Sequence, residues 1–434
     1  MTLRAALSAR QGFAYGLLGL PLAFVALPLY VILPNHYAKE FGMPLATLGI
    51  VLLAARLFDA LIDPLLGRLS DRLFARSAKA VLAFGAGACL LLAVGFMLLF
   101  FPPVRTPGAL IAWVSAALVL TYAAYSALSV SHQSWGAMLG GNEAERSRIV
   151  AWREGLGLVG VILASITPVA FGLPATSAIF VIALIAGWLA WSRAVRPVAA
   201  TTERTATTPL AASTGAIWRP FQHTAFKRLL AVFMLNGIAS AVPATLVLFF
   251  IQDLLQAPAA LEPAFLGSYF VSAALSIPLW LALVKRIGLA RSWLCGMLLA
   301  IAVFAWATQL AAGQTAQFLI ICALSGVALG TDLALPGAML AGVIQAQGDS
   351  GKAEGAYFGW WNFATKLNLA LAAGLALPLL GLFGYAPGVR NPEALSALVV
   401  AYCVLPCVLK LAAAGLLHQL IIKKPAAPPA AISP

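Results

Sequence analysis

Apolar runs of about 20 residues recur along the whole chain, and short polar stretches separate them. A helix needs about 20 apolar residues to cross the hydrocarbon core of a bilayer. The pattern therefore predicts an all-α polytopic membrane protein with twelve transmembrane helices. The predicted spans cover residues 12–34, 45–69, 80–101, 108–133, 153–173, 175–193, 228–252, 263–284, 292–312, 315–342, 356–383 and 395–420.

A segment rich in Thr, Ala and Ser divides these spans into two groups of six. Residues 196–223 have the composition of a flexible linker. Residues 1–195 and 224–424 are then the two six-helix halves, and residues 425–434 form a tail. Short basic loops at 68–79 and 285–291 follow the second span of each half. Two such pseudo-repeats, with a substrate site between them, predict the major facilitator fold.

Composition agrees with this class and explains the charge of the chain. Hydrophobic residues make up 62% of the sequence and charged residues 9%, with a net charge of +13. Most basic residues outside the spans lie on one side, and the other side has only Lys39, Arg105 and Arg390. This asymmetry predicts cytoplasmic termini in a bacterial inner (plasma) membrane. It accounts for the positive charge without a nucleic-acid partner.

Motifs of enzymes are missing from the sequence. No zinc-ligand cluster, phosphate-binding loop or nucleophile elbow is present, and the five cysteines lack the spacing of a disulfide framework. We therefore expect a protein that is not an enzyme and has no cofactor beyond a coupling ion. The expected partners are a small-molecule solute and membrane lipids, with a monomeric chain.

Three charged residues lie inside the second predicted span. Arg56, Asp59 and Asp63 are spaced i, i+3 and i+7, so they share one face of a helix. A charge at the bilayer centre costs about 2.5–3.5 kcal/mol on insertion scales, and such residues usually have a function. The two neighbouring carboxylates repel each other, so they need a cation, a proton or a basic partner.

We predict that Asp59 and Asp63, with the hydroxyl of Ser129, bind the coupling cation, Na⁺ or H⁺. Lys366 in the eleventh span would be the competing counter-charge, and Arg56 would order the pair. The alternative is a structural ion-pair network that holds the two halves together.

Further polar residues within or beside the spans are candidates for the substrate cavity: His132, Gln133, Asp332, Trp361, Asn362 and Asn368. Plainer interpretations exist for several of them. His132 favours a structural hydrogen bond, Asp332 could cap a helix break, and Trp361 could anchor the membrane interface. Lys410 is expected to snorkel or to face a packing partner.

Residues beside the predicted basic turn 67–72 are candidates for a cytoplasmic gate: Asp71, Arg72, Arg146 and Arg153.

The pattern Arg56-x-x-Asp59-x-x-x-Asp63-Pro64 resembles the signature of the glycoside–pentoside–hexuronide:cation symporters. This is the melibiose permease-like branch of the major facilitator superfamily. Glu145-Arg146-Ser147-Arg148 through Arg153 is similar to its loop motif, and Lys366 matches its span-eleven lysine. The resemblance implies Asp59 and Asp63 as cation ligands.

The galactoside-binding residues of that branch, a Lys-Asp pair in span one and an Asp in span four, are not matched. Leu22, Ala23 and Ser129 occupy the corresponding positions, so the resemblance supports cation coupling better than galactoside specificity. We expect a cation-coupled symporter of a small organic solute, with a sugar or glycoside as one candidate. A transporter of a lysolipid or other amphiphile is the first alternative. A non-transporting membrane scaffold or sensor is the second.

Overall fold

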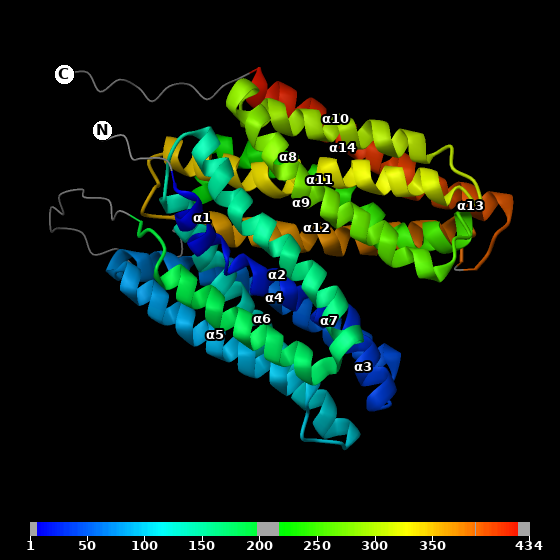
Figure 1. The fold of residues 1–434 in the computed structure, drawn as a ribbon, viewed down its shortest axis with the longest axis horizontal. Coiled ribbons are helices and arrows are strands. Elements are labelled where there is room, and N and C mark those ends of the chain that lie inside the picture. The colour runs from blue at the N-terminus through cyan, green and yellow to red at the C-terminus, as the bar shows by residue number, and fades with distance from the viewer. Residues whose placement is uncertain (1–6, 198–216, 387, 424–434) are drawn as a thin grey trace. The chain divides into compact units, whose positions relative to one another are not determined.

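The computed structural model describes residues 7–197, 217–386 and 388–423, and every regular element in these ranges is helical (Figure 1). The α-helices before residue 200 are α1 (Ala9–Gly16), α2 (Gly19–Leu27), α3 (Leu33–Glu40), α4 (Leu45–Arg76), α5 (Ala78–Phe100), α6 (Pro107–Met138) and α7 (Glu143–Ser192). Those after it are α8 (Thr224–Phe249), α9 (Glu262–Ile287), α10 (Leu289–Ala307), α11 (Thr315–Ala346), α12 (Glu354–Leu382), α13 (Pro392–Val399) and α14 (Leu405–Leu417).

Short π-helical turns join some of these helices into longer rods. One turn, Pro28–Ile32, connects α2 to α3, another, Phe250–Leu254, extends α8, and a third, Val400–Val404, connects α13 to α14. Within the described ranges, nine helical rods are long and apolar enough to cross a membrane. Helices α4 and α12, of 32 and 29 residues, are not among those nine.

Helix α7 contains two of the predicted spans. Its 50 residues run without a loop, but Gly172 inside it has a left-handed backbone (φ +76°, ψ 173°). Glycine adopts this conformation without steric cost, and Pro174 follows it. The chain therefore bends sharply between the predicted spans 153–173 and 175–193, so one long element can serve as two crossings.

The predicted turn at 67–72 is wrong. Helix α4 continues to Arg76, whereas the predicted apolar span ends at residue 69. Gly67 alone does not stop a helix whose other residues are good helix formers. The break comes at Ser77, whose extended backbone and side chain cap α5 through the Ala80 N–H.

The chain divides into two compact units. Unit 1 comprises residues 1–222 and 347–363, and unit 2 comprises residues 223–346 and 364–434. The predicted linker at 196–223 lies mostly outside the described residues, and so does the tail at 425–434. The predicted boundaries of the two halves stay a prediction.

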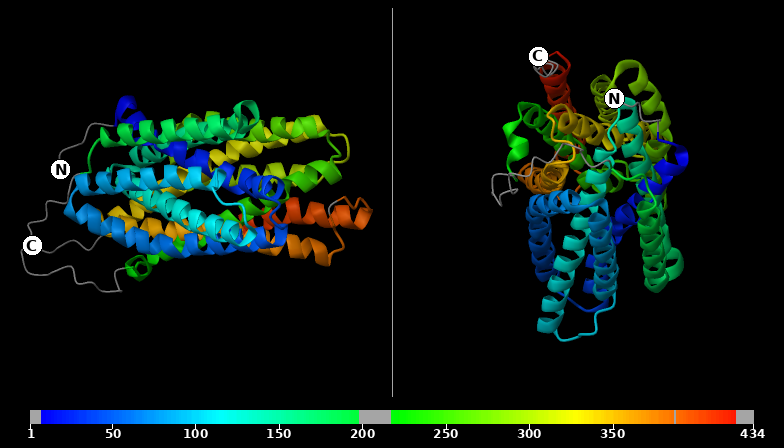
Figure 2. Two further views of the ribbon diagram at one scale, coloured as in Figure 1. Left: turned by 90° about the horizontal axis from the view of Figure 1, so that it is seen from below. Right: turned by 90° about the vertical axis from the view of Figure 1, so that its left-hand side faces the viewer.

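Each unit has its own apolar core. In unit 1, α4 and α5 pack on α6, while α1 and α2 pack on α7; Figure 2 shows α4, α5 and α6 running side by side. Phe180 of α7 stacks on Phe24 and contacts Phe96. In unit 2, α11 lies between α9 and α10, and α14 packs on α8 and α10. Phe250, Phe318 and Tyr402 are in contact at its centre.

Glycines bring α4 and the start of α12 into backbone contact. A Cβ atom on Gly67 would lie 2.0 Å from the carbonyl oxygen of Gly355, and one on Gly355 would lie 2.0 Å from the oxygen of Gly67. One turn further on, a Cβ atom on Gly359 would lie 2.6 Å from the Asp63 oxygen. Only glycine allows helices to approach this closely.

We predict that Gly67→Ala lowers the melting temperature of the purified protein by several degrees, because its methyl group would push α4 and α12 apart. Gly49→Ala, in the same helix, is the matched control. Gly49 has open space around its Cα, so this change should be neutral or raise stability by up to about 1 kcal/mol through helix propensity. Equal melting temperatures for the two variants would contradict the close contact.

Candidate functional site

Two buried carboxylates lie one helical turn apart on α4. Asp59 is 2% exposed and Asp63 is fully buried. The Ser126 hydroxyl of α6 donates a hydrogen bond of 2.7 Å to Oδ1 of Asp59. The i, i+4 spacing places both acids on one face, as the sequence predicts, and the packing of α4 on α6 brings Ser126 to that face.

The surroundings of the acidic pair include charged residues of α7. The phenol of Tyr125, on α6 beside Ser126, lies within electrostatic range of Asp59, Asp63, Arg153 and Glu154. Arg153 and Glu154 form an ion pair with each other. Glu154 thus brings a third carboxyl group to this part of unit 1. Sequence reasoning missed it, although an acid directly after Arg153 at the edge of a predicted span is a usable signal.

Arg56 makes a different contact from the one predicted for it. Its guanidinium lies over the ring of Tyr30, 4.4 Å from the centroid, and the residue is exposed on the surface. A cation over an aromatic face is stabilised by the quadrupole of the ring. Its role in ordering Asp59 and Asp63 stays a prediction.

Ser129, Gln133 and His132 lie along α6 after Ser126. The Gln133 side chain donates to the Ser129 hydroxyl at 3.0 Å. His132 is buried and stacks on Tyr15 with ring centroids 4.4 Å apart. Its Nε2 lies 2.8 Å from the Tyr15 carbonyl oxygen, and the Tyr15 hydroxyl donates to the His132 carbonyl at 3.2 Å. This reciprocal pair ties α1 to α6, which favours the structural interpretation of His132.

Asp332 belongs to a dense polar network in unit 2. Its Oδ1 accepts hydrogen bonds from Asn236 Nδ2 at 3.0 Å and from Trp293 Nε1 at 2.8 Å. Its Oδ2 accepts from Ser240 Oγ at 3.2 Å and from Lys410 Nζ at 2.9 Å. Lys410 also donates to Asn236 Oδ1 at 2.8 Å.

Lys410 therefore faces a packing partner, the second of the two placements expected for it, and its partner Asp332 is the part that the sequence does not show. Lys410 is 6% exposed and does not snorkel, because its ammonium group is paired inside the bundle. Asp332 has partners on three other helices, so it does not act as the cap of a break in its own helix.

Asp71 caps helix α12 from the end of α4. Its Oδ1 accepts from the Gly355 N–H at 2.6 Å and its Oδ2 from the Ala356 N–H at 3.0 Å. A carboxylate at a helix N-terminus satisfies free N–H groups and is attracted by the helix dipole. Burial nevertheless raises the pKa of the Asp71 carboxyl, and the nearby Glu354 adds to this effect, while both N–H groups oppose it.

The remaining candidates fall into both units. Arg72 is exposed, and Arg146 donates to the Gly141 carbonyl at 3.0 Å. Trp361 is buried and Asn362 is half-buried, both in unit 1. Asn368, in unit 2, is buried against Gly237 of α8. Lys366 is half-buried in unit 2, so its predicted pairing with Asp59 and Asp63 stays a prediction.

Across the part of the chain that the structure describes, no group of three or more His, Cys, Asp or Glu side chains could hold a metal ion. A cation bound at Asp59 and Asp63 would therefore need hydroxyl, carbonyl or water oxygens as further ligands, which suits a hard monovalent ion, or it would be a proton.

Comparison with known proteins places the whole chain in one group. The profile of the family described as "MFS/sugar transport protein" matches residues 12–424. A protein of Salmonella typhimurium (strain LT2), named "Putative sulfoquinovose importer", is 29% identical over 168 residues. That alignment covers 37% of this chain and only 34% of the relative.

Solved structures share the fold at low sequence identity. A fucose:proton symporter of Escherichia coli has a TM-score of 0.68 at 14% identity, over 92% of this chain and 98% of its own. A bacterial homologue of the iron transporter ferroportin, in the outward-facing state, has a TM-score of 0.67 at 16% identity, over 94% and 98%. The predicted fold is confirmed: the chain has the all-α major facilitator fold. The matched family consists of transporters, so the protein is a transporter and not an enzyme.

One prediction concerns Glu354, the first residue of α12. Burial raises the pKa of its carboxyl from 4.5 to about 7, while backbone N–H groups, that of Gly351 first among them, oppose the rise. The folded protein then binds this proton more tightly than the unfolded chain, so the stability contributed by Glu354 is fully present below about pH 4.5 and is lost as pH rises to about 7.

Glu354→Gln should remove this loss, which is at most about 3 kcal/mol at 1.36 kcal/mol per pKa unit. Thermal unfolding between pH 5 and pH 8 measures it, with the exposed Glu40→Gln as the control. Parallel pH profiles for wild type and Glu354→Gln would refute the assignment.

Proposed function

The chain belongs to the MFS/sugar transport protein family, and on this premise we propose that it is a cation-coupled symporter of a sugar-like solute. The coupling ion is Na⁺ or H⁺, and transport proceeds by alternating access. The finer assignment, to the glycoside–pentoside–hexuronide:cation symporters, is supported by the pattern from Arg56 to Pro64.

The observation that carries the proposal is the buried pair Asp59 and Asp63 on α4. Two carboxylates one turn apart, with 2% and 0% exposure, are costly to keep in an apolar helix bundle. A bound cation or proton offsets that cost by neutralising one of them. Ser126, already hydrogen-bonded to Asp59, supplies a hydroxyl oxygen of the kind that hard cations accept.

We propose Ser126 in place of Ser129 as the hydroxyl ligand, because Ser126 already lies within hydrogen-bonding distance of Asp59. Lys366 would compete with the cation for the carboxylates. Occupancy by the cation would release that lysine, and this exchange would link the ion to the solute.

The solute class rests on the family and on one relative. That relative is named as an importer of sulfoquinovose, a sulfonated sugar, but the match covers about a third of it. Acidic and neutral hexoses are therefore both to be tried. Trp361, Asn362 and Asn368 supply the aromatic and amide groups that would contact sugar rings and hydroxyls.

The proposed membrane is the bacterial plasma membrane, with both termini in the cytoplasm. Asp71, as the cap of α12, would then act in the cytoplasmic gate together with Arg72, Arg146 and Arg153.

We predict that NaCl raises the melting temperature of the purified protein relative to KCl at equal ionic strength, and that Asp63→Asn abolishes the difference. A ligand at 100 times its Kd stabilises the folded state by about 2.7 kcal/mol. In proteoliposomes, Asp59→Asn should abolish ion-driven uptake of the solute while the protein remains folded. If a proton is the coupling ion, the Na⁺ shift disappears and a pH gradient drives uptake instead.

Asp253→Asn is the matched control, since Asp253 is also a buried carboxylate. It accepts from the Tyr385 hydroxyl at 2.6 Å and from the Gly388 N–H at 3.1 Å, both within unit 2. The Asp253→Asn change should lower the melting temperature without changing the difference in melting temperature between NaCl and KCl. If Asp63→Asn behaves in the same way as Asp253→Asn, and neither ion drives uptake, the acidic pair is scaffold and the proposal fails.

A further inference from the structure

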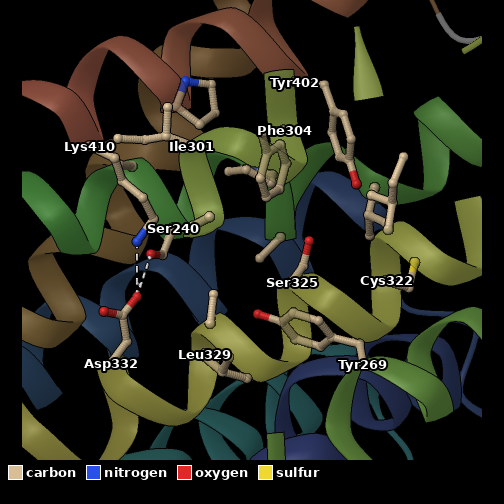
Figure 3. A pocket seen from close by; sticks show the side chains of 18 of the residues that line it. Ser240, Tyr269, Ile301, Phe304, Cys322, Ser325, Leu329, Asp332, Tyr402 and Lys410 are labelled. Carbon is tan, nitrogen blue, oxygen red and sulfur yellow. Dashed lines mark hydrogen bonds and ion pairs between the residues drawn. The ribbon is translucent and has the colours of Figure 1, made fainter. Parts of the chain in front are cut away.

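An open-sided cavity of about 210 Å³ lies within unit 2, between helices α8, α9, α10, α11 and α14 (Figure 3). Its walls are mostly apolar, and two aromatic pairs form part of them. Tyr269 and Phe270 of α9 are in edge contact, with centroids 5.2 Å apart, and Phe304 of α10 lies 5.7 Å from Tyr402. An apolar cavity of about 150 Å³ is large enough for benzene, so this cavity has room for a ring with a short side chain.

The polar end of the cavity is made by Lys410, Asp332 and Ser240 (Figure 3). Asp332 has no acceptor capacity left for a ligand. A carboxylate has about four lone-pair sites, and four donors already fill them, two on each oxygen.

Lys410 has capacity left. Its ammonium group has three N–H donors, and in the described chain it donates to Asn236 and Asp332. Three of the four donors on Asp332 are neutral groups, from Asn236, Ser240 and Trp293. Asp332 therefore keeps hydrogen bonds when Lys410 turns its charge toward another anion.

Ser325 of α11 marks the wall of the cavity beyond its polar end. Its side chain is 9% exposed, lines the cavity, and has a hydroxyl without a hydrogen-bond partner among the described residues. Figure 3 shows this hydroxyl among the cavity side chains, between Lys410 and Tyr402. Because this small side chain lines the cavity, a larger residue at position 325 would fill part of it.

From these observations we propose that the cavity of unit 2 binds a small organic anion with an apolar, ring-sized body. Its carboxylate or sulfonate accepts from the remaining N–H of Lys410. Its ring packs against Tyr269 and Phe270 of α9 and against Phe304 and Tyr402. This site is separate from Asp59 and Asp63, so it stands whether or not those residues bind a cation.

The probe is 3-phenylpropanoate, compared with two molecules of the same shape, neutral 3-phenylpropan-1-ol and cationic 3-phenylpropan-1-amine. Binding is measured by calorimetry on the full-length protein in lipid nanodiscs, with empty nanodiscs as the blank. Wild type should bind the anion at least tenfold more tightly than either analogue. Equal or tighter binding of the amine would overturn the proposal, because the carboxylate of Asp332 would then be the ligand group.

Substitutions of cavity residues test whether 3-phenylpropanoate binds in the cavity of unit 2. Lys410→Gln should weaken binding of 3-phenylpropanoate at least tenfold, and Lys410→Arg should retain most of it. Should Lys410→Gln fail to fold, the double variant Lys410→Gln/Asp332→Asn removes both charges together and keeps hydrogen-bonding groups in place. Ser325→Leu, which fills the cavity and leaves the ion pair intact, should also abolish binding. Lys227→Gln, at an exposed lysine of α8, is the matched control.

Unchanged affinity in the double variant, or in Ser325→Leu, would refute the site. These measurements involve neither ion-driven uptake nor the Na⁺ shift, so failure here is distinct from failure of the proposed symport.

Discussion

The cost of burying ionisable groups among apolar helices governs the polar architecture of this protein. With only 9% charged residues, the chain has few such groups, and those inside the bundle must be neutralised or hydrogen-bonded. Three arrangements are present. Asp59 accepts from a hydroxyl, Asp71 accepts from the N-terminus of a helix, and Asp332 pairs with Lys410. Each ties two or more helices together, so the packing of the helices and the placement of charge depend on each other.

Helix α4 joins two of these arrangements in one rigid element. Asp63 lies one turn before Gly67, and Gly67 contacts Gly355 of α12, whose N–H group is capped by Asp71. The backbone oxygen of Asp63 itself lies against Gly359. A change of charge at Asp63 would therefore act on the helix that also holds the start of α12. In our proposal the ion site at Asp63 and the gate residue Asp71 lie on the same helix, and both contact the start of α12. This shared helix is the physical basis on which ion binding would bias the gate.

Much of the fold could be predicted from the sequence, because the length of apolar runs directly reflects bilayer thickness. The i, i+4 spacing of Asp59 and Asp63 likewise fixes their shared face before any tertiary structure is known. Helix ends were harder to predict, since the sequence does not show that α4 continues through Arg76 until Ser77 caps the next helix. Partners distant in the sequence could not be predicted. Lys410 pairs with Asp332, which lies 78 residues earlier in the sequence, and no local sequence pattern indicates this pairing.

The two buried clusters differ in net charge, and this difference separates their chemistry. The face of α4 carries two acids on one turn, whereas the network around Asp332 carries one acid and one base. Two acids on one turn favour a nearby positive charge or a proton, and Asp332 has Lys410 as its ion-pair partner. With its four acceptor sites filled, Asp332 is a poor ligand for an ion, and its effect is to hold Lys410 inside the bundle. The cation that we propose belongs to the acids of unit 1, and the cavity of unit 2 has a donor, Lys410, as its remaining polar capacity.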